Sequence, residues 1–219
     1  MCGRFYTSHS PQSTELFRSL GIYEAAITNN NVSPTDVVQI IVPGKHERQV
    51  ASANWWLAMK TSDDKGLIPD TKWQTFNTRA DKILSSPLHR IRPKSFRVVI
   101  PAAGYYEWQM GKPVRLNLEN RDIAFGGLAK YWPEQQRFSC SIITLPGHPA
   151  LAHIHKKSVP LMLREQHMEQ WLDRGLSNAD VELIWQKPLA WTLEAQSVKS
   201  PKDPELTGEK EIITLDYAP

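Results

Sequence analysis

The chain has 219 residues, of which 41% are hydrophobic and 22% are charged, and its net charge is +3. This is the composition of an ordinary globular protein with enough residues to bury a sizeable core. Only two cysteines occur, Cys2 and Cys140, which excludes a disulfide framework and gives no sign of secretion. No apolar run approaches about 18 residues and the N-terminus is too polar for a signal peptide, so we expect a soluble, cytoplasmic protein with no membrane partner.

The first half of the chain has the patterns of short strands and one clear helix. The helix opens at Ser10 and Pro11, extends to about Leu20 and stops at Gly21. The other expected elements are a strand over 4–7, a loop over 30–35, a buried strand over 37–42, a strand over 49–57, a flexible surface loop over 61–70 and a short helix around 80–84.

The second half has further short strands followed by two amphipathic helices. The expected strands cover 96–100, 104–108, 114–118, 123–128, 138–144 and 159–163, with a helical turn over 149–154 and helices over 164–172 and 178–186. The strands from 114 to 144 have the spacing of a meander. Many short strands without βαβ alternation predict an α+β fold. We therefore expect a single domain over 1–219, built on an antiparallel sheet or open β-barrel core with flanking helices.

Cys2 differs chemically from an internal cysteine because it directly follows the initiator methionine. Its small side chain favours removal of Met1, which leaves an amine and a thiol on adjacent carbons. Such an aminothiol condenses with an aldehyde through a Schiff base and closes to a five-membered thiazolidine. An α-amine, with a pKa of about 7.7–8.0, is substantially neutral near physiological pH. This observation taken alone favours the alternative, an incidental cysteine at a frayed terminus.

Positive charge is concentrated between Arg79 and Arg97. Six basic residues stand against one acid there, a net charge of +5, which leaves −2 for the rest of the chain. Such an excess can mark a site for a phosphate backbone, and a solvated basic face is the alternative. Nearby aromatic side chains could stack on the bases of single-stranded nucleic acid. They are Trp73, Phe76, Phe96 and Trp108.

Polar residues interrupt the apolar pattern at two places. Glu107 lies between aromatic residues on a predicted strand. A partly desolvated carboxyl group there would have a raised pKa suited to proton transfer. The alternative is that the side chain points to solvent.

Asn77 and Arg79 are two residues apart, so an extended segment places them on one face. Asn77 could orient an amine or a carbonyl and Arg79 could hold a phosphate. The alternative is a turn asparagine followed by a surface arginine.

His153 and His155 invite comparison with a metal site. The sequence has no CxxC, no HExxH and no acidic cluster nearby, so we expect neither a metal nor a cofactor. One histidine acting as a proton donor is the better interpretation. Cys140 lies inside an apolar strand and is expected to be a small buried side chain.

Motifs along nearly the whole chain resemble those of the SRAP (SOS response-associated peptidase) family, the abasic site processing proteins. Their order and spacing are highly specific, although each motif is short. The motifs are MCGRF at 1–5, NVSP at 31–34, WWL at 55–57, NTRAD at 77–81, PAAGYYEW at 101–108, IH at 154–155 with PLML at 160–163, and SV at 197–198 with PEL at 204–206.

The resemblance implies recognition of an abasic site in single-stranded DNA, and its capture as a covalent cross-link that shields the lesion during the response to DNA damage. It assigns the nucleophile to Cys2 after removal of Met1, and positioning of its amine and thiol to Asn77. Glu107 would shuttle protons, and His155 would assist opening of the deoxyribose ring. An autopeptidase activity that releases the residue ahead of Cys2 and a lyase activity through the Schiff base are also implied.

The resemblance further implies a set of contacts to single-stranded DNA, with a monomer as the default state. Arginines would hold phosphates, tryptophans would provide apolar or stacking contacts, and a proline and a lysine complete the set. These residues are Arg4, Pro34, Trp55, Trp56, Arg79, Trp108 and Lys157.

Two segments depart from the family pattern. After His155 the chain runs through Lys156 and Lys157 to Pro160, where the family has a shorter His-x-Arg-x-Pro arrangement. Lysine holds a phosphate as a point charge and lacks the bidentate fork of arginine. Residues 59–70 lack the usual Pro-x-Trp pattern.

Two other functions are compatible with the same residues. One is a hydrolase that cleaves an amide or a peptide with Cys2 as its N-terminal nucleophile. The other is a DNA-binding module in which Cys2 has no chemical role.

Overall fold

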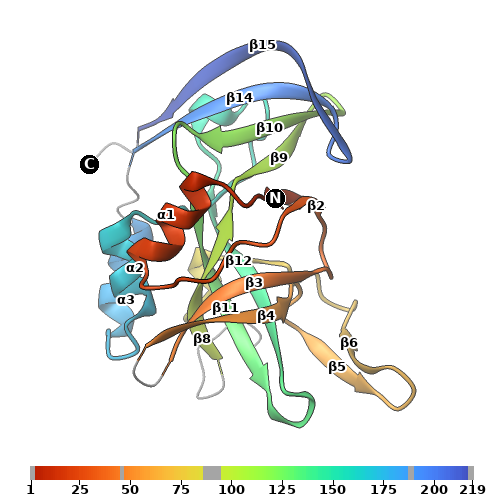
Figure 1. Ribbon diagram of the computed structural model, residues 1–219, viewed down its shortest axis with the longest axis vertical. Helices are drawn as coiled ribbons and strands as arrows, with labels where there is room; N and C mark the ends of the chain where they lie inside the picture. The colour runs from red at the N-terminus through yellow and green to blue at the C-terminus, as the bar shows by residue number, and fades with distance from the viewer. Residues whose placement is uncertain (1–2, 45–46, 86–94, 187–189, 217–219) are drawn as a thin grey trace.

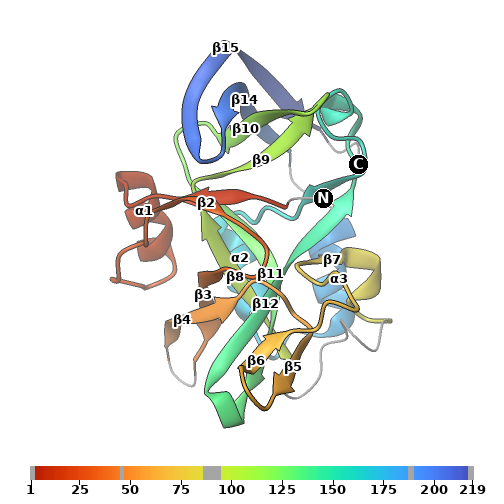
Figure 2. The same cartoon turned by 90° about the vertical axis from the view of Figure 1, so that its right-hand side faces the viewer.

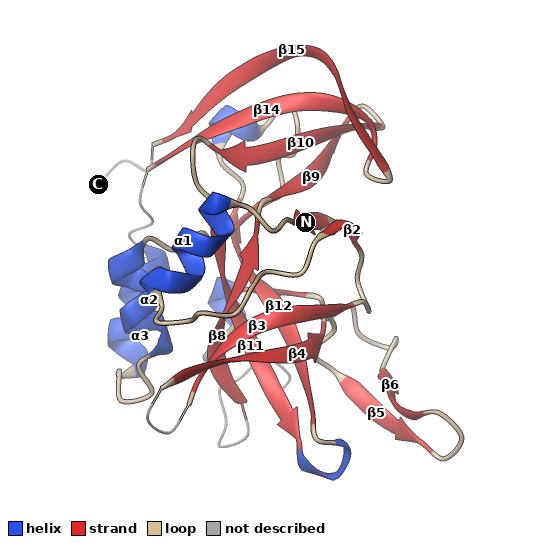
Figure 3. Ribbon diagram, in the orientation of Figure 1, coloured by secondary structure: helices blue, strands red, loops and turns tan. Residues whose placement is uncertain are grey.

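The computed structural model describes residues 3–44, 47–85, 95–186 and 190–216 (Figure 1). Two large sheets lie one above the other in this view, and three α-helices gather on one side (Figure 3). The turned view in Figure 2 shows β2 at the edge of the upper sheet, on the side that faces the lower strands. The predicted α+β fold on a mainly antiparallel sheet and barrel core is therefore confirmed.

The upper sheet has six strands in the order β15-β14-β10-β9-β1-β2. Strand β1 lies between β9 and β2 and pairs with both in antiparallel register, with Phe5 opposite Tyr105 and Val32. The strands are β1 (Phe5–Thr7), β2 (Asn29–Val32), β9 (Gly104–Gln109), β10 (Lys112–Leu118), β14 (Trp191–Ser200) and β15 (Asp203–Leu215).

The lower sheet curves into a ring, because β11 pairs with both β8 and β12 while β3 and β4 connect the other ends. The short strand β7 joins β12 in parallel. The strands are β3 (Val37–Pro43), β4 (Arg48–Asn54), β7 (Asn77–Arg79), β8 (Ser95–Ala102), β11 (Ile123–Trp132), β12 (Arg137–Pro146) and β13 (Ser158–Pro160).

The helices begin where the sequence predicts. Ser10 caps the first helix through a reciprocal capping box with Ser13, in which each hydroxyl accepts from the other residue's backbone N–H. The helices are α1 (Pro11–Ser19), α2 (Glu165–Leu172) and α3 (Asn178–Gln186), with short 3₁₀ turns η1 (Ala80–Lys82), η2 (Pro133–Gln135) and η3 (Pro149–Leu151). No helix in the described ranges is long and apolar enough to span a membrane.

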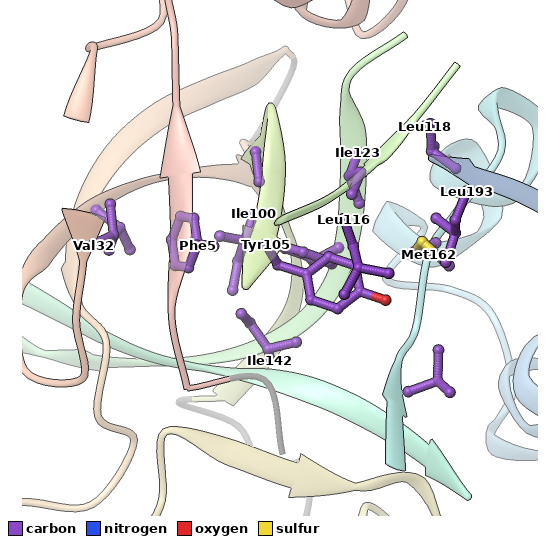
Figure 4. Close-up of a cluster of buried hydrophobic side chains, with 14 of the residues drawn as sticks. Phe5, Val32, Ile100, Tyr105, Leu116, Leu118, Ile123, Ile142, Met162 and Leu193 are labelled. Carbon is purple, nitrogen blue, oxygen red and sulfur yellow. The ribbon is translucent and has the colours of Figure 1, made fainter. Parts of the chain in front are cut away.

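A core of buried apolar side chains fills the space between the two sheets (Figure 4). Phe5 is completely buried there, with its ring edge-on to Trp55 at 4.9 Å and to Phe125 at 6.1 Å. A second buried cluster lies between the lower sheet and the helices and includes Trp171, whose indole N–H donates to the carbonyl of Val98 at 2.9 Å. The N-terminal strand is thus held by the same core that joins the sheets.

Several local predictions are wrong. The expected loop over 61–70 is largely a hairpin of β5 (Met59–Ser62) and β6 (Gly66–Pro69), because Met59 and Leu67 are buried against Trp56. Part of the expected loop over 30–35 is strand β2, which the edge of β1 recruits.

The predicted meander is wrong in part: the second and third of its strands pair with each other, but the first lies in the other sheet. Strand β10 pairs with β9 and β14 in the upper sheet, whereas β11 and β12 belong to the lower sheet. The predicted elements ended at residue 186, so the long pair β14 and β15 was missed. In β15 the apolar alternation is weak, since its residues are almost entirely exposed.

We predict that Trp55→Ala lowers the free energy of unfolding by about 3–5 kcal/mol, because it removes a completely buried aromatic side chain. Trp73→Ala is the matched control, since Trp73 is 49% exposed, and should change stability by no more than about 0.5 kcal/mol. Urea unfolding measures both values. Equal effects of the two substitutions would contradict this assignment of the core.

Candidate active site

The carboxyl group of Glu107 points inward. On β9, Tyr105 and Glu107 occupy alternate positions and therefore share one face of the sheet. Both are buried, with exposed fractions of 1% and 5%, whereas Trp108 on the other face is 39% exposed. The solvent-facing alternative for Glu107 is thus excluded.

His155 reaches this carboxyl group from a different part of the chain. It follows η3, where its backbone N–H donates to the carbonyl of Leu151 at 2.7 Å and the neighbouring Ile154 is buried. The Nδ1 atom of His155 lies 3.2 Å from Oε2 of Glu107. Two residues 48 positions apart in the sequence are therefore in direct contact.

The contact is best described as a hydrogen bond between neutral groups. Burial raises the pKa of Glu107 to about 8. Burial also lowers the pKa of His155 to about 4, and the positive charge of Lys157 contributes in the same direction. Both shifts favour the uncharged forms, so near neutral pH the Glu107 hydroxyl can donate to Nδ1 of His155. The site thus holds a protonated acid beside an unprotonated base.

The first described residues of the chain run directly past Glu107. The backbone N–H of Tyr106 donates to the carbonyl of Arg4 at 2.9 Å, and Phe5 lies opposite Tyr105. Gly3 therefore precedes a segment whose pairing partner is the strand that carries Glu107. Cys2 lies outside the described residues.

Arg4 links two of the motifs that the sequence singled out. Its Nη1 atom donates to Oδ1 of Asn31 at 3.0 Å and to the hydroxyl of Ser33 at 2.6 Å. Pro34 is half-buried in the turn that follows. The segments 1–5 and 31–34 are thus brought together beside β9.

Asn77 begins β7 and is 9% exposed. Hydrogen bonds fix the residues on either side of Asn77. The indole N–H of Trp55 donates to the carbonyl of Phe76 at 2.8 Å, and the hydroxyls of Thr78 and Ser141 share a hydrogen bond at 2.5 Å. The hydrogen bond between Thr78 and Ser141 was not foreseen from the sequence. A Thr and a Ser in apolar strands gave no signal that distinguished them from surface residues.

A surface pocket of about 440 Å³ combines three of the predicted residues, Asn77, Arg79 and Lys157. Asn77 and Arg79 come from β7 and η1 follows directly, while Lys157 precedes β13 on the other side of β12. Asp81 also lines the pocket, and its carboxylate accepts from Nε and Nη2 of Arg79, both at 2.9 Å. The pocket therefore contains two cations and one anion.

The predicted tryptophan contacts are corrected in part. Trp55 is completely buried, which leaves it no surface for stacking on a base, and it supports Phe76 instead. Trp56 is only 8% exposed and packs beside Phe76 with ring centroids 5.7 Å apart. Trp73 and Trp108 are substantially exposed.

The basic segment is also corrected in part. Arg97 is 7% exposed, and its guanidinium donates to the carbonyls of Trp171 and Asp173 at the end of α2. It therefore anchors a helix and is not available to a phosphate. Arg90, Arg92 and Lys94 lie outside the described residues. Phe96 packs edge-on against Phe138 at 5.6 Å.

The last candidates from the sequence are a metal site, His153 and Cys140. Within the described part of the chain, no three His, Cys, Asp or Glu side chains are grouped so that they could hold a metal ion. Nε2 of His153 lies 3.0 Å from a carboxylate oxygen of Glu211 on β15. Cys140 is completely buried, and burial raises the pKa of its thiol, which confirms it as a core side chain.

The sequence model of one family, described as SOS response associated peptidase (SRAP), matches residues 1–201. The chain belongs to this family. The match includes every residue of the site described above.

Similar proteins carry related names. The chain is 27% identical over 195 residues to "Abasic site processing protein YoaM" of Bacillus subtilis (strain 168), covering 82% of each chain. It is 26% identical over 180 residues to "Abasic site processing protein YoqW" of the same organism, covering 78% of each.

Solved structures show the same fold. A crystal structure of a protein from Bacteroides thetaiotaomicron has a TM-score of 0.69 at 23% identity, over 91% of this chain and 97% of that chain. A second, from Bordetella bronchiseptica, has a TM-score of 0.67 at 18% identity, over 91% of this chain and 100% of that chain. The fold of this chain is therefore shared at low sequence identity.

The buried carboxyl group of this SRAP protein predicts a pH-dependent stability. Unfolding returns the pKa of Glu107 from about 8 to its ordinary value of 4.5. The unfolded chain therefore releases this proton at a lower pH than the folded chain does. As a result, the free energy of unfolding falls as the pH rises toward 8. From about pH 6.5 to about pH 8.5, the free energy of unfolding should fall more for the wild type than for Glu107→Gln.

Chemical denaturation at each pH measures this difference. Glu119→Gln, a substitution at an exposed acid, is the control and should follow the wild-type profile. Parallel profiles for the wild type and Glu107→Gln would contradict the raised pKa. His155 stays unprotonated in the folded protein throughout this window, because its pKa is about 4, and its titration in the unfolded chain near 6.5 is common to both profiles.

Proposed function

We propose that this protein processes abasic sites in single-stranded DNA by capturing the ring-opened aldehyde on Cys2 after removal of Met1. The observation that carries the proposal is the neutral Glu107–His155 contact, 3.2 Å long, beside the strand that the first residues of the chain join. The names of the relatives, abasic site processing proteins, support the same substrate.

The chemistry requires no metal, oxidant or reductant. The amine of Cys2 adds to the aldehyde carbon, and loss of one water gives a Schiff base. The thiol then adds across the C=N bond, with sulfur on carbon and the proton on nitrogen, to close a thiazolidine. The net reaction is aldehyde plus aminothiol giving thiazolidine plus water.

Glu107 and His155 provide the proton transfers for these steps. A Glu107 that is protonated near neutral pH can donate to the departing hydroxyl of the carbinolamine and recover a proton from the amine. His155, unprotonated because its pKa is about 4, can accept the hydroxyl proton of the closed sugar and so open the ring. Asn77, nearly buried at the start of β7, is suited to orient the amine and the thiol.

The DNA strand would pass over the pocket beside Asn77. Arg79 and Lys157 line this pocket and can hold phosphates, and Arg4 adds a third positive charge near β9. Trp108 is exposed enough to stack on a base, while Trp56 and Pro34 offer smaller apolar edges. Trp55 is excluded from direct contact by its burial and acts through Phe76.

The same groups could support two associated reactions. Release of the residue ahead of Cys2 would be an autopeptidase step, consistent with the family's description as a peptidase. A Schiff base that does not close would allow β-elimination of the neighbouring phosphate, a lyase reaction. Because the site draws on β7, β9 and the segment before β13, we propose that residues 1–219 act as one domain and as a monomer.

We predict that the wild type forms a band that resists denaturation when it is incubated with a single-stranded oligonucleotide containing one abasic site. Cys2→Ala should abolish this band. Insertion of one glycine between Met1 and Cys2 should abolish it as well wherever mass spectrometry shows that the glycine is retained, because the cysteine then lacks a free amine. A denaturing gel measures all three proteins side by side.

Two outcomes would overturn the proposal. One is the absence of a cross-link with wild type whose Met1 is confirmed to be removed. The other is a cross-link that persists in Cys2→Ala. Turnover of an amide substrate that depends on Cys2, without a cross-link, would instead favour an N-terminal-nucleophile hydrolase.

We also predict that Glu107→Gln slows cross-link formation by about 10²-fold or more, because it removes the proton donor and keeps the shape of the side chain. Glu119→Gln should leave the rate unchanged, since Glu119 is exposed. Single-turnover time courses on gels measure the rates. A rate for Glu107→Gln within a factor of two of the wild-type rate would remove Glu107 from the mechanism.

A further inference from the structure

We propose that Asp81 is a positioning residue that orients Arg79 toward a phosphate of the bound strand. This inference rests on the proposed function, because it assigns a role within the same pocket. It starts from the one carboxylate that lines a pocket otherwise furnished with two cations. A carboxylate in a site for an anion opposes binding unless it has another task.

The geometry of the pair indicates that task. Asp81 accepts from Nε through Oδ1 and from Nη2 through Oδ2, both at 2.9 Å, so it occupies the side edge of the guanidinium. Arginine has five N–H donors in a rigid plane. The end edge, formed by Nη1 and the second hydrogen of Nη2, stays available for a bidentate contact with a phosphate. Asp81 therefore holds the plane without occupying the edge that a phosphate needs.

The backbone of the pair is fixed, whereas the Arg79 side chain is not. Arg79 ends β7 opposite Thr144, and η1 then turns the chain so that Asp81 returns toward Arg79. Ala80 and Ile83, both buried, anchor this turn in the core. The Arg79 side chain itself is 74% exposed, so the bidentate contact is what limits its orientation.

The pair has little to contribute to stability. Exposed ion pairs contribute about 0–1 kcal/mol, and the Asp81 side chain is 51% exposed. A substitution at Asp81 should therefore leave the melting temperature almost unchanged. An effect on DNA binding can thus be separated from an effect on folding.

The sign of that effect distinguishes positioning from simple electrostatics. Asp81→Asn removes a negative charge from a pocket with Arg79 and Lys157, and it also frees Lys82, whose Nζ lies 3.9 Å from Oδ2 of Asp81. Electrostatics alone therefore predicts tighter binding to DNA. Positioning predicts weaker binding, because Arg79 keeps only one of its two fixed contacts and the phosphate must supply the rest of its ordering.

The test measures binding of an undamaged single-stranded oligonucleotide over a range of salt concentrations. For Asp81→Asn we expect about three- to fivefold weaker binding and a salt slope lower by about 1, as for Arg79→Gln. Asp81→Glu, which keeps the two carboxylate oxygens, should restore part of the loss. In the Arg79→Gln background, Asp81→Asn should cause no further loss. Glu24→Gln removes an equal charge from an exposed position outside the pocket and should not weaken binding.

The cross-linking reaction provides the second arm. If the wild type cross-links an abasic oligonucleotide but Asp81→Asn binds undamaged DNA as tightly as the wild type or more tightly, this inference is wrong and the proposed function stands. If the wild type neither binds DNA nor cross-links it, the proposed function is wrong, and the inference about Asp81 is wrong with it. A further loss in the Arg79→Gln background would also contradict positioning through Arg79.

Discussion

The complete burial of Phe5 is the constraint on which the arrangement of this molecule depends. Its ring fills the core between the two sheets, in contact with Trp55 and Phe125, and so fixes β1 between β9 and β2. A strand held at this point places the beginning of the chain along β9, which carries Glu107. Packing of one aromatic side chain thereby determines which polar groups lie close to the N-terminal segment.

Burial also accounts for the chemistry of the site. Water is largely excluded from Glu107, so the carboxyl group keeps its proton near neutral pH, and the imidazole of His155 beside it stays uncharged. The charged side chains of Arg79 and Lys157 lie instead in a pocket at the surface, where both are exposed. The site thus combines a neutral buried pair, suited to moving protons, with exposed cations suited to phosphates.

Local patterns in the sequence predicted most strands and all three α-helices, because alternation, caps and glycine stops are local signals. Local patterns failed where tertiary contacts determine the secondary structure. The hairpin over 59–69 forms because Met59 and Leu67 pack on Trp56. Strand β15 forms because β14 offers a long edge for pairing. Glu107 and Asn77 stood out because polar residues interrupt apolar strands. The burial of Trp55 and the structural use of Arg97 were invisible, since the sequence does not show which face of a strand a side chain occupies.

The most direct test of the account is peptide mapping by mass spectrometry after incubation with a single-stranded abasic oligonucleotide, without any reducing agent. The account predicts that the DNA remnant is found on the peptide that begins at Cys2, with Met1 absent and one water lost on attachment. The contradicting result is no remnant without reduction, together with a remnant on a lysine such as Lys157 in a parallel sample reduced with borohydride.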